Sequence, residues 1–213
     1  MLKANKKTLI LTSLVMLIPV VIGLIFWSRL PDPMAIHFGA DNEANGFAAK
    51  PVAVFAFPLG LLALQWLMPV LLSLDPKRKN ISPKMTALVL WLIPIISVFV
   101  CAFMYAFNLG YPVNITFFAE LMIGLIFIVV GNYLPKTRQN YMVGIRLPWT
   151  LANEENWNRT SRLAGPLMIV GGLLIVILTL TGTLTVLWLL LIFAVLLLVP
   201  IIYSCWLHLA RGL

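Results

Sequence analysis

The stretch LAGPLMIVGGLLIVILTLTGTLTVLWLLLIFAVLLLVPIIYSCWL, residues 163 to 207, contains no charged side chain. At about 1.5 Å per residue, a helical run of this length can cross a hydrocarbon core of about 30 Å twice. A threonine–glycine–threonine turn at 181–183 lies near its middle. A backbone in lipid must satisfy its own hydrogen bonds, and strand alternation is absent, so the stretch predicts two membrane-spanning helices.

Four more spans are expected upstream. The run from 85 to 119 is too long for one crossing and is divided at NLGYPVN, residues 108–114, whose glycine and proline favour a turn. The chain is 62% hydrophobic and 10% charged, a composition typical of membrane proteins. We therefore predict an all-α integral membrane protein with six transmembrane helices, the first four at about 8–28, 51–74, 85–108 and 115–134.

The first run is interpreted as an uncleaved span, because no small-residue cleavage site follows it. Prolines inside the runs predict kinks where neighbouring helices recover the freed carbonyls. We expect two halves of three spans each, 1–114 and 115–213, in a loose inverted 3+3 arrangement. Cys101 and Cys205 lie in apolar runs without metal-ligand spacing and are interpreted as small buried side chains, so no cofactor or metal is expected.

The lysines and arginines predict that both termini lie inside. With that orientation, 13 of the 15 basic residues fall in inner segments, among them Lys3, and only Arg29 and Lys50 fall outside. The basic residues are scattered among apolar runs, so the net charge of +8 does not indicate direct nucleic-acid binding.

The outer loop, Arg29 to Lys50, supplies candidate ligand-binding residues. It resembles the start of a calcium loop, but Val52 stands where the bidentate glutamate should be. His37, Asp41 and Glu43 could bind a transition metal, but the sequence shows nothing that would hold this loop in one conformation. An Asx- and Gly-rich turn structure is the main interpretation, with recognition of an extracellular ligand as the alternative; the candidates are His37, Phe38, Asp41, Glu43 and Asn45.

The inner loop, Pro135 to Arg162, predicts a short helix capped by Asn153 that runs into the fifth span. Glu155 and Arg159 form an i,i+4 pair on it. Trp149 and Trp157 are expected at the lipid headgroups, which would make this segment an interfacial anchor. The anchor does not explain Arg146-x-Pro148-Trp149-Thr150, where proline stiffens the backbone. We expect Arg146 to pair with Glu154.

Two motifs resemble those of the SdpI family, the membrane immunity proteins of the sporulation-delaying-protein toxin system of Gram-positive bacteria. The inner motif residues are Gly131, Asn132, Pro135, Asn140, Gly144, Arg146, Pro148, Trp149, Thr150, Leu151, Glu154, Trp157, Arg162 and Gly165. The outer loop resembles the family's companion domain at Leu30, Pro31, His37, Phe38, Asn45, Gly46, Phe47 and Lys50. The chain departs from the family pattern at Ala35, Asn42, Leu147 and Ser161.

The resemblance implies a multi-pass protein of the bacterial plasma membrane that gives immunity to a secreted membrane-active peptide toxin on the outer side. It also implies a cytoplasmic helix-turn-helix repressor as partner of the inner motif. The partner-binding candidates are then Asn132, Asn140, Gly144, Arg146, Pro148, Trp149, Thr150, Glu154, Trp157 and Arg162.

Glu120 carries the alternative function, an ion- or proton-coupled small transporter. It is the one ionisable residue deep in a predicted span, and a charge there is costly, so we expect it to be protonated and to face other helices. An enzyme is not expected, because His37 and His208 fall on opposite sides and no nucleophile–base or HExxH pattern is present.

Overall fold

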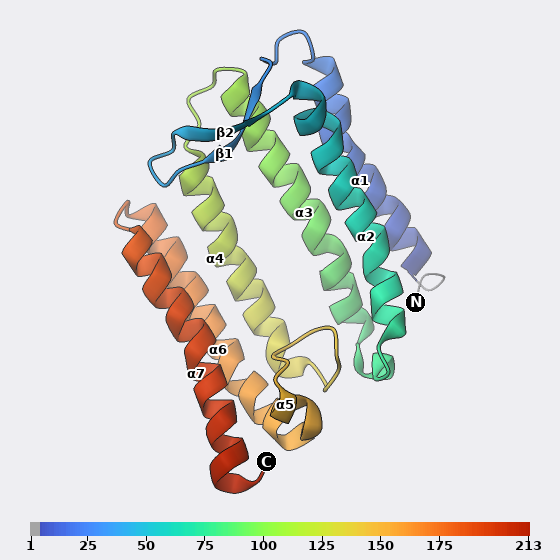
Figure 1. Cartoon of the computed structure of the whole chain (residues 1–213), viewed down its shortest axis with the longest axis vertical. Helices are drawn as coiled ribbons and strands as arrows, with labels where there is room; N and C mark the ends of the chain where they lie inside the picture. The colour runs from blue at the N-terminus through green and yellow to red at the C-terminus, as the bar shows by residue number, and fades with distance from the viewer. Residues whose placement is uncertain (1–4) are drawn as a thin grey trace. The chain divides into compact units, whose positions relative to one another are not determined.

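The computed structural model describes residues 5–213, so the predicted inner charge of Lys3 lies outside the described residues. Six helices are long and apolar enough to cross a membrane, which confirms the predicted helical fold (Figure 1). They comprise Lys6–Ile25, Val52–Leu74, Pro83–Asn108, Ile115–Lys136, Glu154–Leu180 and Val186–Arg211.

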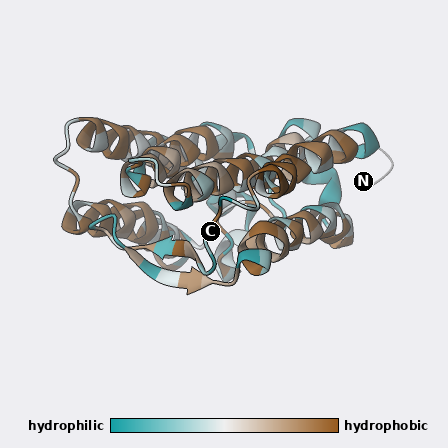
Figure 2. Cartoon of the chain, turned by 90° about the horizontal axis from the view of Figure 1, so that it is seen from above, coloured by the Kyte–Doolittle hydropathy of each residue, from teal (hydrophilic) through white to brown (hydrophobic). Residues whose placement is uncertain are grey.

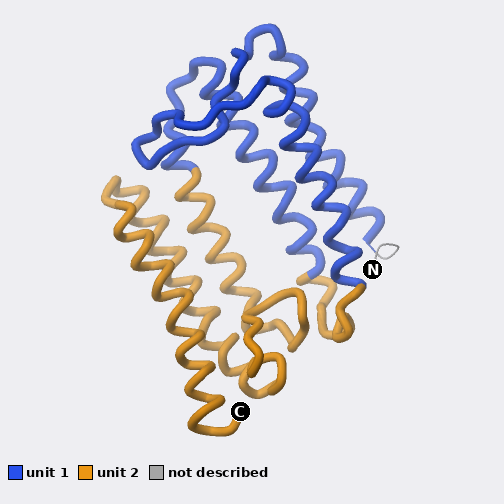
Figure 3. Tube along the Cα trace, viewed as in Figure 1, with its two compact units in different colours: residues 1–73, 86–118 blue, residues 74–85, 119–213 orange. Residues whose placement is uncertain are grey.

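The chain divides into two compact units (Figure 3). Unit 1 comprises residues 1–73 and 86–118, and unit 2 comprises residues 74–85 and 119–213. Helix α4, Ile115–Tyr133, is continuous across the division: its first turn belongs to unit 1 and the rest to unit 2. The predicted halves, the inverted arrangement and the inward orientation of both termini stay predictions.

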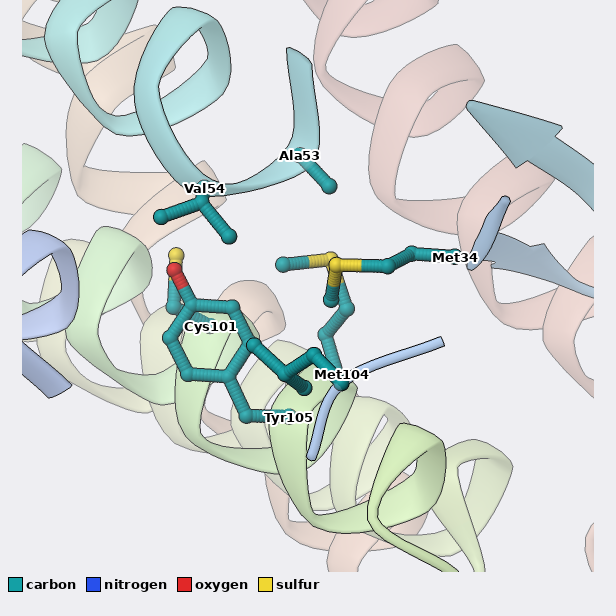
Figure 4. Close-up of a cluster of buried hydrophobic side chains, with 7 residues drawn as sticks. Met34, Ala53, Val54, Cys101, Met104 and Tyr105 are labelled. Atoms are coloured by element: carbon teal, nitrogen blue, oxygen red, sulfur yellow. The ribbon is translucent and has the colours of Figure 1, made fainter. Parts of the chain in front are cut away.

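Unit 1 contains α1 (Lys6–Ile25) and most of α2 (Phe57–Leu74) and α3 (Pro83–Asn108). The backbone before α2 widens into the π-helix η2 (Val52–Ala56), next to Pro58, which has no N–H to give the Val54 carbonyl four residues earlier. Around this turn the unit buries a hydrophobic cluster, part of which Figure 4 shows: Leu30, Met34, Ala53, Val54, Cys101, Met104 and Tyr105.

A glutamine recovers the carbonyl that a proline frees in α3. Pro94 cannot donate to the Leu90 carbonyl, and the Gln65 Nε2 of α2 donates to that oxygen at 2.6 Å. The same Nε2 lies 3.0 Å from the Thr12 hydroxyl of α1, and Gln65 is fully buried. This contact confirms at Pro94 the expectation that neighbouring helices satisfy kinked segments.

The outer loop forms a short hairpin that the sequence analysis missed. Strands β1 (Met34–Phe38) and β2 (Ala44–Ala48) pair antiparallel, with irregular register on either side of His37. Each strand has five residues, and the loop between them closes by the Gly39 N–H donating to the Glu43 carbonyl at 2.9 Å. Such short, bulged strands give too little alternation to be recognised from sequence.

Unit 2 holds η3 (Arg78–Asn80), most of α4, η4 (Leu134–Lys136), α5 (Pro148–Ala152), α6 (Glu154–Leu180) and α7 (Val186–Arg211). Pairs of glycines bring α4 and α6 into backbone contact. A Cβ on Gly131 would lie 2.6 Å from the Gly165 carbonyl oxygen, and one on Gly124 would lie 2.9 Å from that of Gly172. The two glycines of α4 are seven residues apart in sequence, and so are the two glycines of α6. One face of each helix therefore makes the contact.

Helices α6 and α7 form the predicted hairpin. The first ends at Leu180 and the second begins at Val186, and Gly182 adopts a φ of +67° in the turn between them. Large apolar side chains stand exposed along α7, which suits lipid contact: Leu187, Leu190, Leu197 and Ile202 are 62–65% exposed. Figure 2 shows hydrophobic residues along the helices and hydrophilic residues in the connecting segments.

Cysteine labelling can test the predicted orientation. In a chain with Cys101 and Cys205 replaced by serine, we expect a membrane-impermeant thiol reagent added to intact cells to label Ala40→Cys and not Ala152→Cys. Both alanines are exposed. After permeabilisation both should react, which controls for access; the reverse pattern in intact cells would refute the orientation.

Candidate functional site

The outer hairpin is fastened to α3 through Asn108. Its side chain accepts a hydrogen bond from the Ala35 N–H and donates one to the Ala35 carbonyl, both at 2.8 Å. The amide therefore takes the place of a neighbouring strand along this edge of β1. At the base of the hairpin, Lys50 donates from its backbone N–H to Asp32 and from its Nζ to the Trp27 carbonyl, both at 3.1 Å.

The loop of the hairpin caps α4 through Asn42. The Asn42 Oδ1 accepts from the backbone N–H groups of Ile115 at 2.7 Å and Thr116 at 3.3 Å. The Thr116 hydroxyl donates back to the Gly39 carbonyl at 3.1 Å. Asn42 has a φ of 64°, a conformation that glycine and asparagine tolerate best, so asparagine suits this position.

The predicted outer residues divide into two groups. The structure joins His37 and Asn45, whose Nδ1 and Oδ1 lie 2.5 Å apart, and packs Phe38 edge-on against Phe107 of α3. Asp41 only closes a local turn, accepting from the Glu43 N–H at 3.1 Å. Within residues 5–213, no three His, Cys, Asp or Glu side chains are grouped to hold a metal ion.

Glu120 lies half-buried on α4 in unit 2. The side chain that faces it is Thr179 of α6, which is buried and whose hydroxyl makes no hydrogen bond of standard geometry. Thr179 is thus a polar neighbour of the carboxyl group within unit 2.

A turn held by Asn140 begins the inner platform, which we define as residues 137–157. The buried Asn140 side chain donates to the Arg138 and Val143 carbonyls at 2.8 and 2.9 Å. Its Oδ1 accepts from the N–H groups of Met142 and Val143 at 2.9 and 2.7 Å. These four hydrogen bonds of the side chain all lie within one turn, so Asn140 shapes the platform.

Pro148 and Thr150 set the next element, α5. Pro148 occupies the first helical position, where no N–H is needed. The buried Thr150 hydroxyl accepts from the Leu147 N–H at 2.8 Å and lies 2.8 Å from the Ile145 carbonyl, to which it can donate. These contacts hold residues 145–147 against α5, which explains the stiff backbone expected around Pro148.

Trp157 forms the core of the platform, so its predicted place at the headgroups is wrong. The side chain is 1% exposed, and its Nε1 donates to the Thr137 carbonyl at 2.9 Å. Its ring lies 2.6 Å from where a Cβ on Gly144 would be, and Gly144 has a φ of +128°. Glycine is therefore required at 144 both by conformation and by the indole ring. An indole has an apolar ring and a polar N–H, so its chemistry suits both the headgroup region and a buried pocket. The residues that the fold brings around Trp157 decide between the two.

The expected pair of Arg146 with Glu154 is also wrong. The Arg146 Nη1 donates to the Tyr141 carbonyl at 2.9 Å. The ion pair that the structure forms among residues 5–213 is Glu155 with Arg159 at 2.6 Å, as the i,i+4 spacing predicted. Asn153 caps α6 as expected, accepting from the N–H groups of Glu155 and Asn156.

Sequence reasoning missed two polar residues that tie the platform to the loop after α2. Asp75 is 2% exposed and accepts from the Lys77 and Tyr141 N–H groups at 2.7 and 2.8 Å. Gln139 donates from Nε2 to the Thr150 carbonyl at 2.7 Å and accepts from the Lys77 Nζ. Neither lies in a motif, and polar residues in loops give no sequence signal of burial.

A third missed group joins the platform to α7. The buried Asn156 accepts from the Ser204 hydroxyl at 2.6 Å and donates to the Ser204 carbonyl at 3.0 Å. The Trp149 Nε1 donates to the same hydroxyl at 2.7 Å, and its ring stacks on His208. Trp149 is thus held by α7 rather than free to enter the headgroup region.

The remaining candidates stay exposed on this rigid support. Asn132 accepts from the Lys136 Nζ at 3.1 Å, and the other four lie on the loop, α5 and the first turns of α6. The exposed candidates are Asn132, Arg146, Pro148, Glu154 and Arg162. The predicted set thus separates into an internal framework and an accessible surface.

Comparison with known proteins agrees with both motifs. The model of the SdpI/YfhL protein family matches residues 136–204, and that of a domain of unknown function, DUF1648, matches residues 14–62. The immunity protein SdpI of Bacillus subtilis (strain 168) is 25% identical over 178 residues, covering 81% of this chain and 82% of that protein. No solved structure matches.

The matched segments contain the features described above: the first holds the inner platform from Asn140 to α7, and the second holds the hairpin. The six apolar helices and the likeness to an immunity protein identify a multi-pass bacterial membrane protein. The resemblance that the motifs predicted is confirmed: this chain is similar to the SdpI/YfhL family over residues 136–204 and to an SdpI immunity protein over 81% of its length.

Proposed function

We propose that this protein gives its cell resistance to a secreted, membrane-active peptide. The observation that carries the proposal is the similarity to immunity protein SdpI across 81% of the chain. The hairpin supports it, because it exposes His37, Asp41, Glu43 and Asn45 on a framework fixed by Asn108 and Asn42. A fixed surface binds a ligand with less loss of conformational entropy than a free loop.

The experiment is complementation. We expect expression of this chain in a B. subtilis strain that lacks its own SdpI to restore growth in the presence of the sporulation-delaying toxin. A second host carries the same gene and is challenged with peptides secreted by the species from which this protein comes. This host controls for toxin specificity. If the protein is inserted at normal level and neither host is protected, the proposal is wrong.

We further propose that the exposed part of the inner platform recruits a cytoplasmic repressor. Arg146 on the platform and Arg162 farther along α6 offer positive charge, and Arg146 is positioned by its hydrogen bond to the Tyr141 carbonyl. The connection to the outside is α4, whose first turn is capped by Asn42 and whose last turns contact α6 through Gly131. A toxin that displaces the hairpin would thereby act on a continuous helix that leads into the platform.

A second candidate function, a small ion- or proton-coupled transporter, rests on Glu120 facing Thr179. We predict that Glu120→Gln inserts at wild-type level, because an amide replaces a carboxyl group of nearly the same shape. A transporter should lose uptake or proton flux in liposomes with this variant, whereas resistance that does not use a titrating carboxyl should persist. Thr179→Val is the matched control for the partner hydroxyl. Full flux in Glu120→Gln would refute a titrating role.

A further inference from the structure

One face of α3 buries a row of polar groups inside unit 1. Pro94, Ser97, Cys101 and Tyr105 follow each other at intervals of three or four residues, so they share one helix face with the Leu90 carbonyl. Ser97 and Cys101 are fully buried and Tyr105 is 3% exposed. We call this row the α3 polar face.

The α3 polar face is covered by α1, η2 and α2. At the Pro94 end, Gln65 of α2 donates to the Leu90 carbonyl and contacts the Thr12 hydroxyl of α1. At the other end, the Tyr105 hydroxyl lies 3.0 Å from where a Cβ on Gly23 of α1 would be. In Figure 4 this hydroxyl is directed toward the Cys101 sulfur and Val54 of η2. The row thus runs through the interior of unit 1 and does not face lipid.

Three side-chain atoms in this interior make no hydrogen bond of standard geometry: Gln65 Oε1, Ser97 Oγ, which lies beside the Cys101 thiol, and the Tyr105 hydroxyl. A buried hydroxyl or amide without a hydrogen bond costs about 1–3 kcal/mol in proteins, and more in hydrocarbon, where no solvent can compensate. Three such groups together would cancel a large part of the roughly 5–15 kcal/mol that stabilises a folded domain. The sequence nevertheless places all three on facing surfaces of one unit.

The helix geometry places Ser97 within one turn of Pro94. The Leu90 carbonyl points along α3 toward Pro94, and Gln65 is fixed at that carbonyl. Ser97 follows Pro94 by three residues, which is roughly 4.5 Å along the axis. Cys101 and Tyr105 follow at further steps of about 6 Å each. A buried water needs two to four polar partners, and the polar groups of this row are the ones that could supply them.

We propose that ordered water is bound along the α3 polar face, bridging Gln65 Oε1 to Ser97 Oγ and reaching the Tyr105 hydroxyl. Each water would donate to the amide oxygen or accept from a hydroxyl and so complete the hydrogen bonding at the Pro94 kink. The site takes small hydroxylic molecules, since an apolar group would leave the same three atoms unpaired. The proposal does not depend on the proposed resistance function.

The test uses the full chain in lipid nanodiscs with Cys205 replaced by serine. Water-edited solid-state NMR should give cross-peaks from water to the Gln65 side chain and to Ser97 that are absent at Leu90 side-chain methyl groups. In D2O the S–H stretch of Cys101, read by infrared spectroscopy, should be replaced by S–D within the time of the experiment. A dry interior would show neither transfer nor exchange, and either absence would overturn the proposal.

Two variants provide an independent readout through thermal stability. If the hydroxyls are bound to water, Ser97→Ala and Tyr105→Phe should leave Tm unchanged or lower it, and each should remove its own water cross-peak. If the hydroxyls are dry and unpaired, removing them should raise Tm, which would refute the proposal. Tyr111→Phe is the matched control, because Tyr111 is 58% exposed. A Tm that depends on Na⁺ at constant ionic strength would identify a cation site instead and would equally overturn it.

Discussion

Replacing Gly131 by leucine is expected to remove the protein from the membrane fraction. A Cβ at this position would lie 2.6 Å from the Gly165 carbonyl oxygen, 2.8 Å from the Met168 Cβ and 2.9 Å from the Ile169 N. Two of these three atoms are backbone atoms of α6, which cannot turn aside as a side chain can. Overpacking in a core costs about 1–3 kcal/mol where neighbours adjust, so a clash with backbone should cost more than about 3 kcal/mol.

The measurement is protein level in membranes together with Tm in detergent. Gly60→Leu is the matched control, because Gly60 also lies within an apolar helix and a Cβ there meets nothing within 4 Å. We expect the control to insert at wild-type level. Normal folding of Gly131→Leu would show that α4 and α6 do not pack through their glycines. Gly124→Leu should behave like Gly131→Leu, since its Cβ would meet the Gly172 carbonyl at 2.9 Å.

The spans could be predicted from sequence because their cause is local. Each run is apolar over the thickness of a bilayer, and no other part of the chain is needed to make it helical. The Asn153 cap and the Glu155–Arg159 pair were found for the same reason: each connects residues within one or two helical turns. The position of the α6–α7 turn followed from the small polar residues between two runs.

The hairpin and the platform could not be predicted in the same way, because distant residues hold them. The strand at Ala35 depends on Asn108, and the turn before Tyr141 depends on Asp75, each separated by more than 60 residues from its partner. Trp157 and Arg146 were placed wrongly from their own chemistry. An indole suits the headgroups and a guanidinium suits a carboxylate, but a buried pocket and a nearer backbone carbonyl competed successfully for them.

The second large effect is expected at Trp157, which belongs to the internal framework of the platform and not to its accessible surface. Trp157→Ala should lose the platform, because it empties the space of a fully buried indole and leaves the Thr137 carbonyl without its donor. Loss of a buried tryptophan side chain costs about 3–5 kcal/mol, comparable with the stability of a small domain. We expect reduced membrane level, faster proteolysis of the 137–157 segment and, as a consequence, loss of both resistance and partner recruitment.

Arg146→Ala is the contrasting variant, since Arg146 is exposed and makes one hydrogen bond to a carbonyl, that of Tyr141. It should keep wild-type protein level and Tm within about 1 kcal/mol of stability, as surface substitutions usually do. If the accessible face binds a cytoplasmic repressor, this variant should lose recruitment, measured by reporter expression and membrane co-sedimentation, while toxin resistance persists. Arg159→Ala controls for removal of a positive charge, because Arg159 is paired with Glu155. Equal recruitment by Arg146→Ala and wild type would place the docking surface elsewhere, whereas a collapse of Arg146→Ala like that of Trp157→Ala would assign Arg146 to the framework.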